Sequence, residues 1–586
     1  MGEPLDTEVA IETPEHIVFR TRVAGPARRA LAQLVDLVVC YGALALAALL
    51  TAFAVFGVSA SLSGSIEHLS SAAKALGGLL FVALFAAQWL YFVVFEAATG
   101  RTPGKAALGL RVVTTTGRPI GPHAAVIRNL LRTADFLPTG YLLGGAAMLL
   151  SRRFQRLGDL AAGTMVVVPE RPRRAAVTEL VPAATARELE TLPAHVALDA
   201  EERAAIELFR RRRGALGEVR ERELATMLAG PLGARLGVAH EDPARLLALL
   251  HDRAVATGRA ERAFTEERRP AWDRLEELCR RATSRRLRKL ALEDVRDLPA
   301  LYRIVSADLA AAEAARHGAP LVAYLRGLAA TAHGVLYGPH AGGRDERERL
   351  SFRRTWGTAF PRAVRRRWRA MALSAALFLL PLALGVTLVL REPTMAFRIV
   401  PEAMLRPLTE GYARGFGAGR DGAESAFMTG FYVYNNVGIA LRCFATGIFG
   451  GLGSAFFLVQ NGLSIGAILG YVASQGAGVN IVTFIVGHGS LELGAIVLAG
   501  GAGLSLGWSI VAPGALSRRR ALEASARDVV VIVVGAAGML VLAALVEGFW
   551  SASDVAREVK LATGATLFLL LAAYVTVGGR GEERAP

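Results

Sequence analysis

Apolar positions form two groups of long runs, one near each end of the chain, with a charged region between them. In the first group, residues 31–56 and 77–96 are each long enough to cross about 30 Å of hydrocarbon. Residues 121–150 hold two shorter apolar stretches divided by Pro138, and neither can span alone. The pattern therefore predicts two spans followed by a re-entrant hairpin. Between the second span and this hairpin, Leu110–Thr115 has the pattern of a short strand.

The second group predicts a bundle of six membrane-spanning helices. The runs that predict it are 371–390, 429–449, 452–473, 481–511, 529–548 and 560–577. The run at 481–511 is longer than a bilayer requires, and it could be broken at Gly487–Gly489. An even number of spans places the C-terminus on the same side as the segment before the first of them.

The middle of the chain is charged and rich in alanine, and its apolar positions recur at helical spacing without any run long enough to span. We therefore predict an all-α polytopic membrane protein with helices outside the membrane. The predicted domains are a two-span membrane domain at 1–170, a cytoplasmic helical linker region at 171–264, a cytoplasmic helical segment preceding the bundle at 265–370, and the bundle at 371–586.

The formal net charge of +16 comes almost entirely from arginine. Basic clusters flank the predicted spans, and the positive-inside rule then places both termini in the cytoplasm. The basic residues are interleaved with acids and lack aromatic neighbours, which argues against nucleic-acid binding. Anionic lipid is the partner that this charge favours.

No motif predicts catalysis, a cofactor or a metal. The segment Gly100–Lys105 has only three residues between its glycines and no Ser or Thr after the lysine, so it fails the phosphate-loop pattern. His488 lacks the second histidine that a zinc protease of the H-E-x-x-H type requires. The three cysteines are far apart, which excludes a disulfide framework.

A polar set lies within the apolar runs of the second group. It consists of His488, Glu492, Asn435, Asn436, Arg442, Asn461 and Glu547. His488 and Glu492 are four residues apart, so they share one helix face. Ionisable groups in such runs are costly to bury and often functional. The set could line a proton or ion pathway, or it could hold the helices in register, with Glu492 pairing with Arg442.

Small residues at a spacing of four recur in the same region, at 462, 466 and 470 and again at 499, 503 and 507. This spacing lets helix backbones approach closely in lipid, so we expect these positions at helix contacts. In the first predicted span, Asp36 lies two turns beyond Arg29, which makes an Arg29–Asp36 ion pair geometrically feasible.

Four blocks in order make residues 17–170 resemble an RDD-family membrane domain. These blocks are Arg29-x-x-Ala32-x-x-x-Asp36, Gly100–Lys105 with Leu110–Val113, Arg128-Asn129-Leu130-Leu131-Arg132-x-x-Asp135, and Arg156-Leu157-Gly158-Asp159 with Ala162-Gly163-Thr164. The resemblance maps the namesake arginine of the family to Arg29 and its first aspartate to Asp36. The second aspartate is either Asp135 or Asp159. The resemblance suggests a transport role.

Residues 265–550 resemble the stage II sporulation protein M family. The motifs are Asn435-Asn436, Ala445-x-Gly447-x-x-x-Gly451, Asn461-Gly462-x-x-x-Gly466, and His488-Gly489-x-x-Glu492. The resemblance implies a bacterial membrane scaffold without catalysis, and a MoxR-type AAA+ ATPase as a cytoplasmic protein partner.

The sequence therefore predicts a multi-pass protein of the bacterial inner membrane that acts as a non-enzymatic scaffold and recruits soluble partners. Assembly as a homo-oligomer is compatible with this prediction. The alternative is a transporter or cation/proton antiporter whose pathway uses Glu492, His488 and Asp36.

Overall fold

The computed structural model describes residues 7–12, 18–61, 66–168, 185–193, 196, 198–212, 218–256, 259–284, 291–314, 319–337, 355–415 and 419–580. The chain divides into two compact units. The first, here called the membrane unit, comprises Met1–Thr13, Arg20–Pro169 and Gly343–Pro586. The second, here called the helical unit, comprises Pro14–Phe19 and Glu170–Gly342.

Six stretches of helix among the described residues are long and apolar enough to cross a membrane. They are Pro26–Phe53, Ser71–Thr99, Trp368–Arg391, Leu452–Val511, Arg518–Ser551 and Arg557–Val577. The prediction of an all-α polytopic membrane protein is therefore confirmed. The segment predicted as a span at 429–449 is helical, but it is not among the six stretches.

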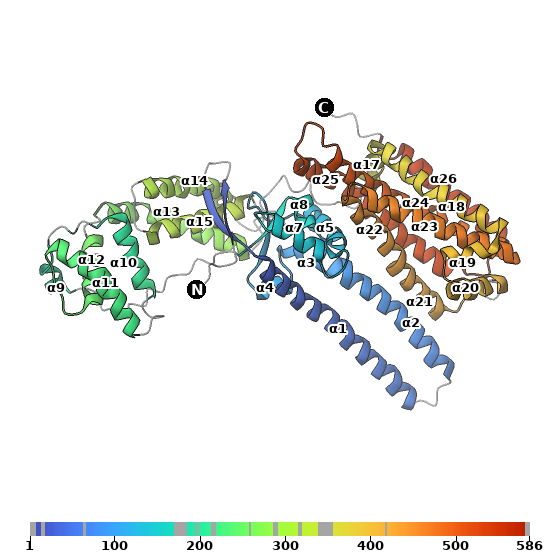
Figure 1. Cartoon of the computed structure of the whole chain (residues 1–586), viewed down its shortest axis with the longest axis horizontal. Helices are drawn as coiled ribbons and strands as arrows, with labels where there is room; N and C mark the ends of the chain where they lie inside the picture. Colours follow the sequence, from blue (N-terminus) through green and yellow to red (C-terminus); the bar gives the residue numbers. More distant parts are fainter. Residues whose placement is uncertain are drawn as a thin grey trace. The chain divides into compact units, whose positions relative to one another are not determined.

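The N-terminal part of the membrane unit begins with two long helices that pack against each other (Figure 1). They are α1 (Pro26–Ser61) and α2 (Ile66–Phe85), and α2 continues through the π-helical turn η1 (Ala86–Leu90) into α3 (Tyr91–Thr99). Most of α1 is exposed within the chain, as expected for a helix that faces lipid.

Short helices follow these two spans. They are α4 (Pro103–Ala107), α5 (Pro122–Leu130), α6 (Arg132–Phe136), α7 (Leu142–Leu150) and α8 (Leu157–Ala162). The three helices between 122 and 150 are too short to span, and α6 packs against α7, so the chain turns back within this region as the hairpin prediction requires.

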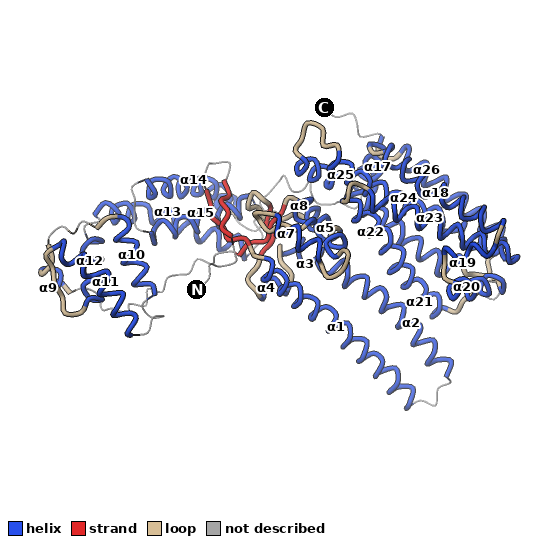
Figure 2. The backbone as a smooth tube through the Cα atoms, in the orientation of Figure 1, coloured by secondary structure: helices blue, strands red, loops and turns tan. Residues whose placement is uncertain are grey.

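A four-stranded sheet accompanies these helices (Figure 2). Its strands are β1 (Thr7–Glu12), β2 (Val18–Val23), β3 (Arg111–Thr114) and β4 (Thr164–Val168), in the order β1-β2-β4-β3. β4 pairs antiparallel with both β2 and β3. The sequence indicated only the strand near 110–115, and no local pattern indicated that β4 pairs with β2, which lies far from it in the chain.

The C-terminal part of the membrane unit is a helical bundle. Its elements are η4 (Thr355–Ala359), α17 (Phe360–Arg366), α18 (Trp368–Arg391), η5 (Pro393–Met395), α19 (Ala396–Ile399), α20 (Glu402–Arg414), α21 (Gly422–Tyr432), η6 (Val433–Val437), α22 (Gly438–Ala445), η7 (Thr446–Ile448), α23 (Leu452–Val472), η8 (Ala473–Ala477), α24 (Gly478–Val511), α25 (Arg518–Leu545), η9 (Val546–Ser551) and α26 (Arg557–Val577).

The helix break suggested at Gly487–Gly489 does not occur, because α24 runs without interruption from Gly478 to Val511. The chain bends earlier, at Gly476, whose φ of 84° lies in the left-handed region that glycine adopts without strain. Glycine within α24 serves close packing of helices instead, as at Gly503.

The small residues at a spacing of four lie at helix contacts, which confirms their predicted role. A Cβ atom at Gly462 would lie 2.2 Å from the carbonyl oxygen of Phe378 on α18. A Cβ atom at Gly503 would lie 2.1 Å from the hydroxyl of Ser454 on α23. Backbones meet at these points, so a larger side chain would force the helices apart.

The N-terminal part and the bundle share one hydrophobic core. Trp89, Ile127 and Leu131 belong to the same buried cluster as Phe444 and Val529. The helices α2 and α21 also approach closely, since a Cβ atom at Gly430 would lie 2.1 Å from the carbonyl oxygen of Gly78. The two predicted membrane domains therefore form a single packed unit.

The helical unit contains α9 (Ala186–Glu190), α10 (Ala200–Arg212), α11 (Glu218–Leu236), α12 (Pro243–Ala256), α13 (Arg259–Ser284), α14 (Leu292–Ala314) and α15 (Ala319–Tyr337). It has two separate cores. One contains Phe209 and Leu247, from the helices up to α12, and the other contains Trp272, Tyr302 and Leu325, from α13 to α15.

Candidate functional site

The first buried polar group, here called the arginine network, centres on Arg128 of α5. Its guanidinium is fully buried and donates to Oε2 of Glu96 at 2.7 Å and to a carboxylate oxygen of Asp159. Arg29 of α1 donates to the other oxygen of Asp159 at 2.6 Å. Lys105 pairs with Glu96 at 2.5 Å. Buried carboxylates are thus matched by buried cations, as charges in a low-dielectric interior require.

Asp36 does not pair with Arg29, so the predicted Arg29–Asp36 ion pair is wrong. The carboxylate of Asp36 instead accepts hydrogen bonds from the hydroxyl of Thr102 at 2.5 Å and from the backbone N–H of Gly104 at 2.7 Å. Tyr91 donates a third at 3.0 Å. The side chain of Arg29 reaches α8 because the fold brings that helix beside the start of α1.

The segment Gly100–Lys105 is thereby explained as the binding turn for Asp36. Thr102 caps α4, and its hydroxyl accepts from the backbone N–H of Lys105 while it donates to Asp36. A Cβ atom at Gly104 would lie 2.2 Å from the carbonyl oxygen of Ala32, so only glycine allows α4 to approach α1 this closely.

The two candidates for the second family aspartate have different environments. Burial raises the pKa of Asp159, but the Arg128 and Arg29 guanidinium groups lower it by more, so its pKa lies below the usual range. Burial raises the pKa of Asp135 to about 6, and Arg156, at 3.4 Å, opposes this only in part. Asp159 is therefore the aspartate that stays ionised beside the arginines when the pH falls below about 6.

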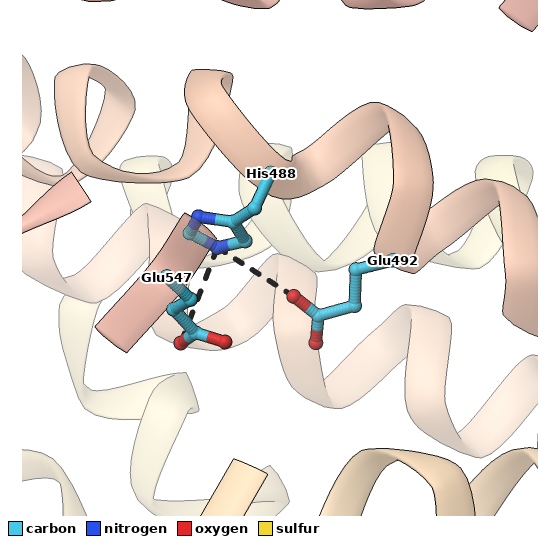
Figure 3. A group of neighbouring side chains, drawn as sticks. All are labelled: His488, Glu492 and Glu547. Atoms are coloured by element: carbon cyan, nitrogen blue, oxygen red, sulfur yellow. Dashed lines mark ion pairs between the residues drawn. The ribbon is translucent and has the colours of Figure 1, made fainter. Parts of the chain in front are cut away.

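The second polar group, here called the bundle cluster, consists of His488, Glu492 and Glu547 (Figure 3). Nε2 of His488 lies 3.5 Å from Oε2 of Glu492 and 4.0 Å from Oε1 of Glu547. His488 and Glu492 project from neighbouring turns of α24, and Glu547 comes from η9. His488 and Glu547 are buried.

Further polar side chains hold this cluster. Ser551 lies with its hydroxyl 2.9 Å from Nδ1 of His488, and Asn436 donates to Oε1 of Glu492 at 2.9 Å. Asn435 in turn donates to the side-chain oxygen of Asn436 at 2.9 Å. Tyr432 interacts with both Glu547 and Arg420. The bundle cluster is therefore set within an ordered polar surrounding.

Two π-helical turns supply most of these partners. Asn435 and Asn436 lie in η6, and Glu547 and Ser551 lie in η9. A π-helical turn contains an extra residue, which rotates the side chains that follow it, and such turns are frequent at functional sites. Nothing in the apolar periodicity indicated either turn.

Two predicted members of the polar set, Asn461 and Arg442, make no hydrogen bond or ion pair to the cluster among the described residues. Asn461 on α23 donates to the carbonyl oxygen of Phe457 on its own helix. Glu492 accepts from Asn436 rather than from Arg442, and no ion pair joins Glu492 and Arg442 in the described part of the chain. The suggested Glu492–Arg442 pair is therefore wrong.

Several partners were not singled out from the sequence. Glu96 marked only the end of a predicted span, and Arg128 appeared only within a family block, yet together they form the centre of the arginine network. Ser551 gave no sequence signal at all. An acidic residue at the end of an apolar run, as Glu96 is, could have drawn attention to the network.

Comparison with known families finds three matches along the chain. The RDD family matches residues 23–163, and Stage II sporulation protein M matches residues 374–552. A third match, to a Domain of unknown function (DUF8413), covers residues 262–338. No curated protein and no solved structure matches the chain.

Each polar group falls within one matched domain, because the arginine network lies between 29 and 159 and the bundle cluster between 488 and 547. Both family resemblances are confirmed over the matched residues, and the second match begins at 374 rather than at 265. The chain is therefore a multi-pass membrane protein that joins an N-terminal RDD-family domain to a C-terminal domain of the Stage II sporulation protein M family.

Proposed function

We propose that this protein is a non-enzymatic scaffold of the bacterial inner membrane, with both termini in the cytoplasm, whose helical unit recruits a cytoplasmic protein. The observation that supports this most directly is the helical unit itself. Its described residues contain no helix long and apolar enough to span, yet they form two cores of their own. A folded unit inserted between two membrane domains suits the presentation of a binding surface.

Buried contacts hold the membrane unit together. The two membrane domains share a core, and the arginine network fixes α1, α3, α5 and α8 together through buried ion pairs. Buried ion pairs of this kind favour one arrangement of helices over others, which suits a scaffold.

The partner class follows from the resemblance to stage II sporulation protein M, which implies a MoxR-type AAA+ ATPase. The test measures binding of the purified ATPase from the same bacterium to the full-length protein in lipid nanodiscs. Arg269 and Arg280 of α13 are well exposed, at 68% and 75% of their side chains. Reversing both to Glu is expected to weaken binding at least tenfold if the partner docks on this charged face.

Arg406→Glu provides the matched control, because its side chain is 68% exposed but lies on α20 of the membrane unit. Binding that is absent for the wild-type protein, or that the control weakens as much as the α13 variant does, would contradict recruitment by the helical unit.

Transport is the second candidate function, and the bundle cluster is the observation that favours it, because intramembrane acids beside an imidazole occur along ion and proton pathways. Ion and proton flux would be measured in liposomes containing wild-type protein, Glu492→Gln, or Glu558→Gln as a control. Flux that Glu492→Gln abolishes and Glu558→Gln preserves would replace the scaffold proposal. A scaffold predicts no flux in any of the three.

A further inference from the structure

The bundle cluster brings three metal-ligand atoms together inside an apolar bundle. One ring nitrogen of His488 and one carboxylate oxygen each of Glu492 and Glu547 lie within 4.8 Å of one another. We propose that these three side chains bind a divalent transition-metal ion, with Zn²⁺ as the probe of choice. This site is independent of the proposed recruitment of a cytoplasmic partner.

The distances suit a metal after a small adjustment. Ligand atoms around a four-coordinate Zn²⁺ lie about 2.0–2.2 Å from the metal, which puts them roughly 3.4 Å from each other. The His488–Glu492 distance is already 3.5 Å and the His488–Glu547 distance is 4.0 Å. A change in the side-chain torsions of Glu547 would close the remaining gap without moving a helix backbone.

The position of the ligands in the fold limits what must be ordered on binding. His488 and Glu492 are four residues apart on α24, so both face η9 from one side of that helix. η9 is held close to α21, because a Cβ atom at Gly548 would lie 1.9 Å from the hydroxyl of Thr429. The helical framework therefore sets all three ligands in place beforehand, which favours tight binding.

The hydrogen bonds around the cluster are those expected around metal ligands. A histidine that binds a metal through one nitrogen usually engages a polar partner with the other, and ligating carboxylates are themselves hydrogen bonded. Nδ1 of His488 lies 2.9 Å from the Ser551 hydroxyl, which leaves Nε2 toward the carboxylates. Asn436 holds Oε1 of Glu492 and leaves Oε2 toward His488.

Glu547 gives an independent indication of a ligand. Glu547 is only 7% exposed, and its Oε2 atom is buried without a hydrogen-bond partner among the described residues. Figure 3 shows the carboxylates of Glu547 and Glu492 on the same side of the imidazole. The carboxylates of the buried Glu547 and the partly buried Glu492 repel each other at this separation, so the site favours a bound cation.

The donor set selects the class of metal. One imidazole and two carboxylates suit Zn²⁺, Mn²⁺ or Fe²⁺, whereas Mg²⁺ and Ca²⁺ prefer oxygen ligands alone. The family motif His488-Gly489-x-x-Glu492 supplies only two ligands, and the third comes from a different element 55 residues further along the chain.

The test uses the full-length protein in detergent, with any affinity tag removed and metal stripped by a chelator. Zn²⁺ binding is measured by competition with a fluorescent chelator, and Co²⁺ is used as an optical probe of the ligand environment. We expect one tight equivalent for the wild type. His488→Ala and Glu547→Gln are each expected to bind at least tenfold more weakly, and Glu558→Gln, an exposed glutamate on α26, is expected to bind like the wild type.

Ser551→Ala separates a loss of metal binding from a loss of fold, because it removes only the hydroxyl beside His488. Its Zn²⁺ affinity is expected to fall about tenfold while circular dichroism and gel filtration remain unchanged. The proposal would be overturned if the wild type bound Zn²⁺ no more tightly than the His488→Ala and Glu547→Gln variants that remain folded. Unchanged affinity in folded Ser551→Ala and Glu547→Gln proteins would overturn it equally.

Discussion

The arginine network and the bundle cluster are both buried polar groups of the membrane unit, but their charges are balanced differently. In the arginine network, Glu96 contacts two basic side chains at ion-pair distance and Asp159 contacts three. In the bundle cluster, two carboxylates face one imidazole, and one oxygen of Glu547 has no partner among the described residues.

This difference separates a structural role from a binding role. A network whose charges are matched by its own side chains gains nothing from an added ion, and it holds helices in place. A cluster with excess carboxylate is completed by a proton or a cation. Removing one charged group should therefore have opposite effects on the stability of the protein in the two places.

Arg128→Ala is the change with the largest expected effect. It would leave the buried carboxylates of Glu96 and Asp159 without their shared partner, and breaking a buried pair in this way costs about 3–5 kcal/mol. Thermal unfolding of the purified protein in detergent measures the loss. Arg101→Ala, on an exposed side chain of the same domain, should change stability by less than about 0.5 kcal/mol. Equal effects of the two changes would show that the network is not structural.

Gly430→Leu tests whether the two polar groups belong to one cooperative unit. A side chain at this position would collide with the backbone of Gly78, so α2 and α21 must separate at a cost of about 3 kcal/mol. Gly42→Leu is the control, since a Cβ atom there meets no other atom within 4 Å. We expect two unfolding transitions in place of one for Gly430→Leu, and a single unshifted transition would contradict the shared core.

Asp135 provides a pH test within the arginine network. Because its folded pKa is raised from 3.8 to about 6, the folded state holds the proton more tightly than the unfolded state does. Stability is therefore lost as pH rises, by about 2 kcal/mol between pH 4.5 and pH 7.5 for this group. The lowered pKa of Asp159 has the opposite sign, and its contribution is lost only as pH falls below about 4.

Asp135→Asn should remove the loss between pH 4.5 and pH 7.5 and leave the acid limb unchanged. Unfolding temperatures of both proteins across this range provide the measurement. If the wild type and the variant show parallel profiles, Asp135 is already ionised at pH 4.5 and the burial argument fails.

Glu547→Gln has the smallest expected effect and the opposite sign. In the presence of a chelator, loss of the buried member of this pair of neighbouring carboxylates should stabilise the protein by about 1 kcal/mol. Added Zn²⁺ should stabilise the wild type and not the variant. Destabilisation of the metal-free variant by several kcal/mol would place the bundle cluster in the same class as the arginine network.

The sequence was sufficient for the large elements of the fold. Apolar runs long enough to cross a bilayer located the spans that include α1, α18 and α26, because hydrophobic length determines whether a helix can cross. Small residues at a spacing of four located the contacts at Gly462 and Gly503, since only they permit backbones to approach. The i, i+4 spacing placed His488 and Glu492 on one helix face.

Long-range pairing was decided by the tertiary structure. Arg29 pairs with Asp159 across 130 residues instead of with Asp36 on its own helix, and Glu547 reaches the bundle cluster from η9. β4 also pairs with β2 and β3, which lie far from it in the chain. Local periodicity fixes which face a side chain occupies, but the energy of a buried charge depends on the groups that the fold brings around it, and these come from distant parts of the chain.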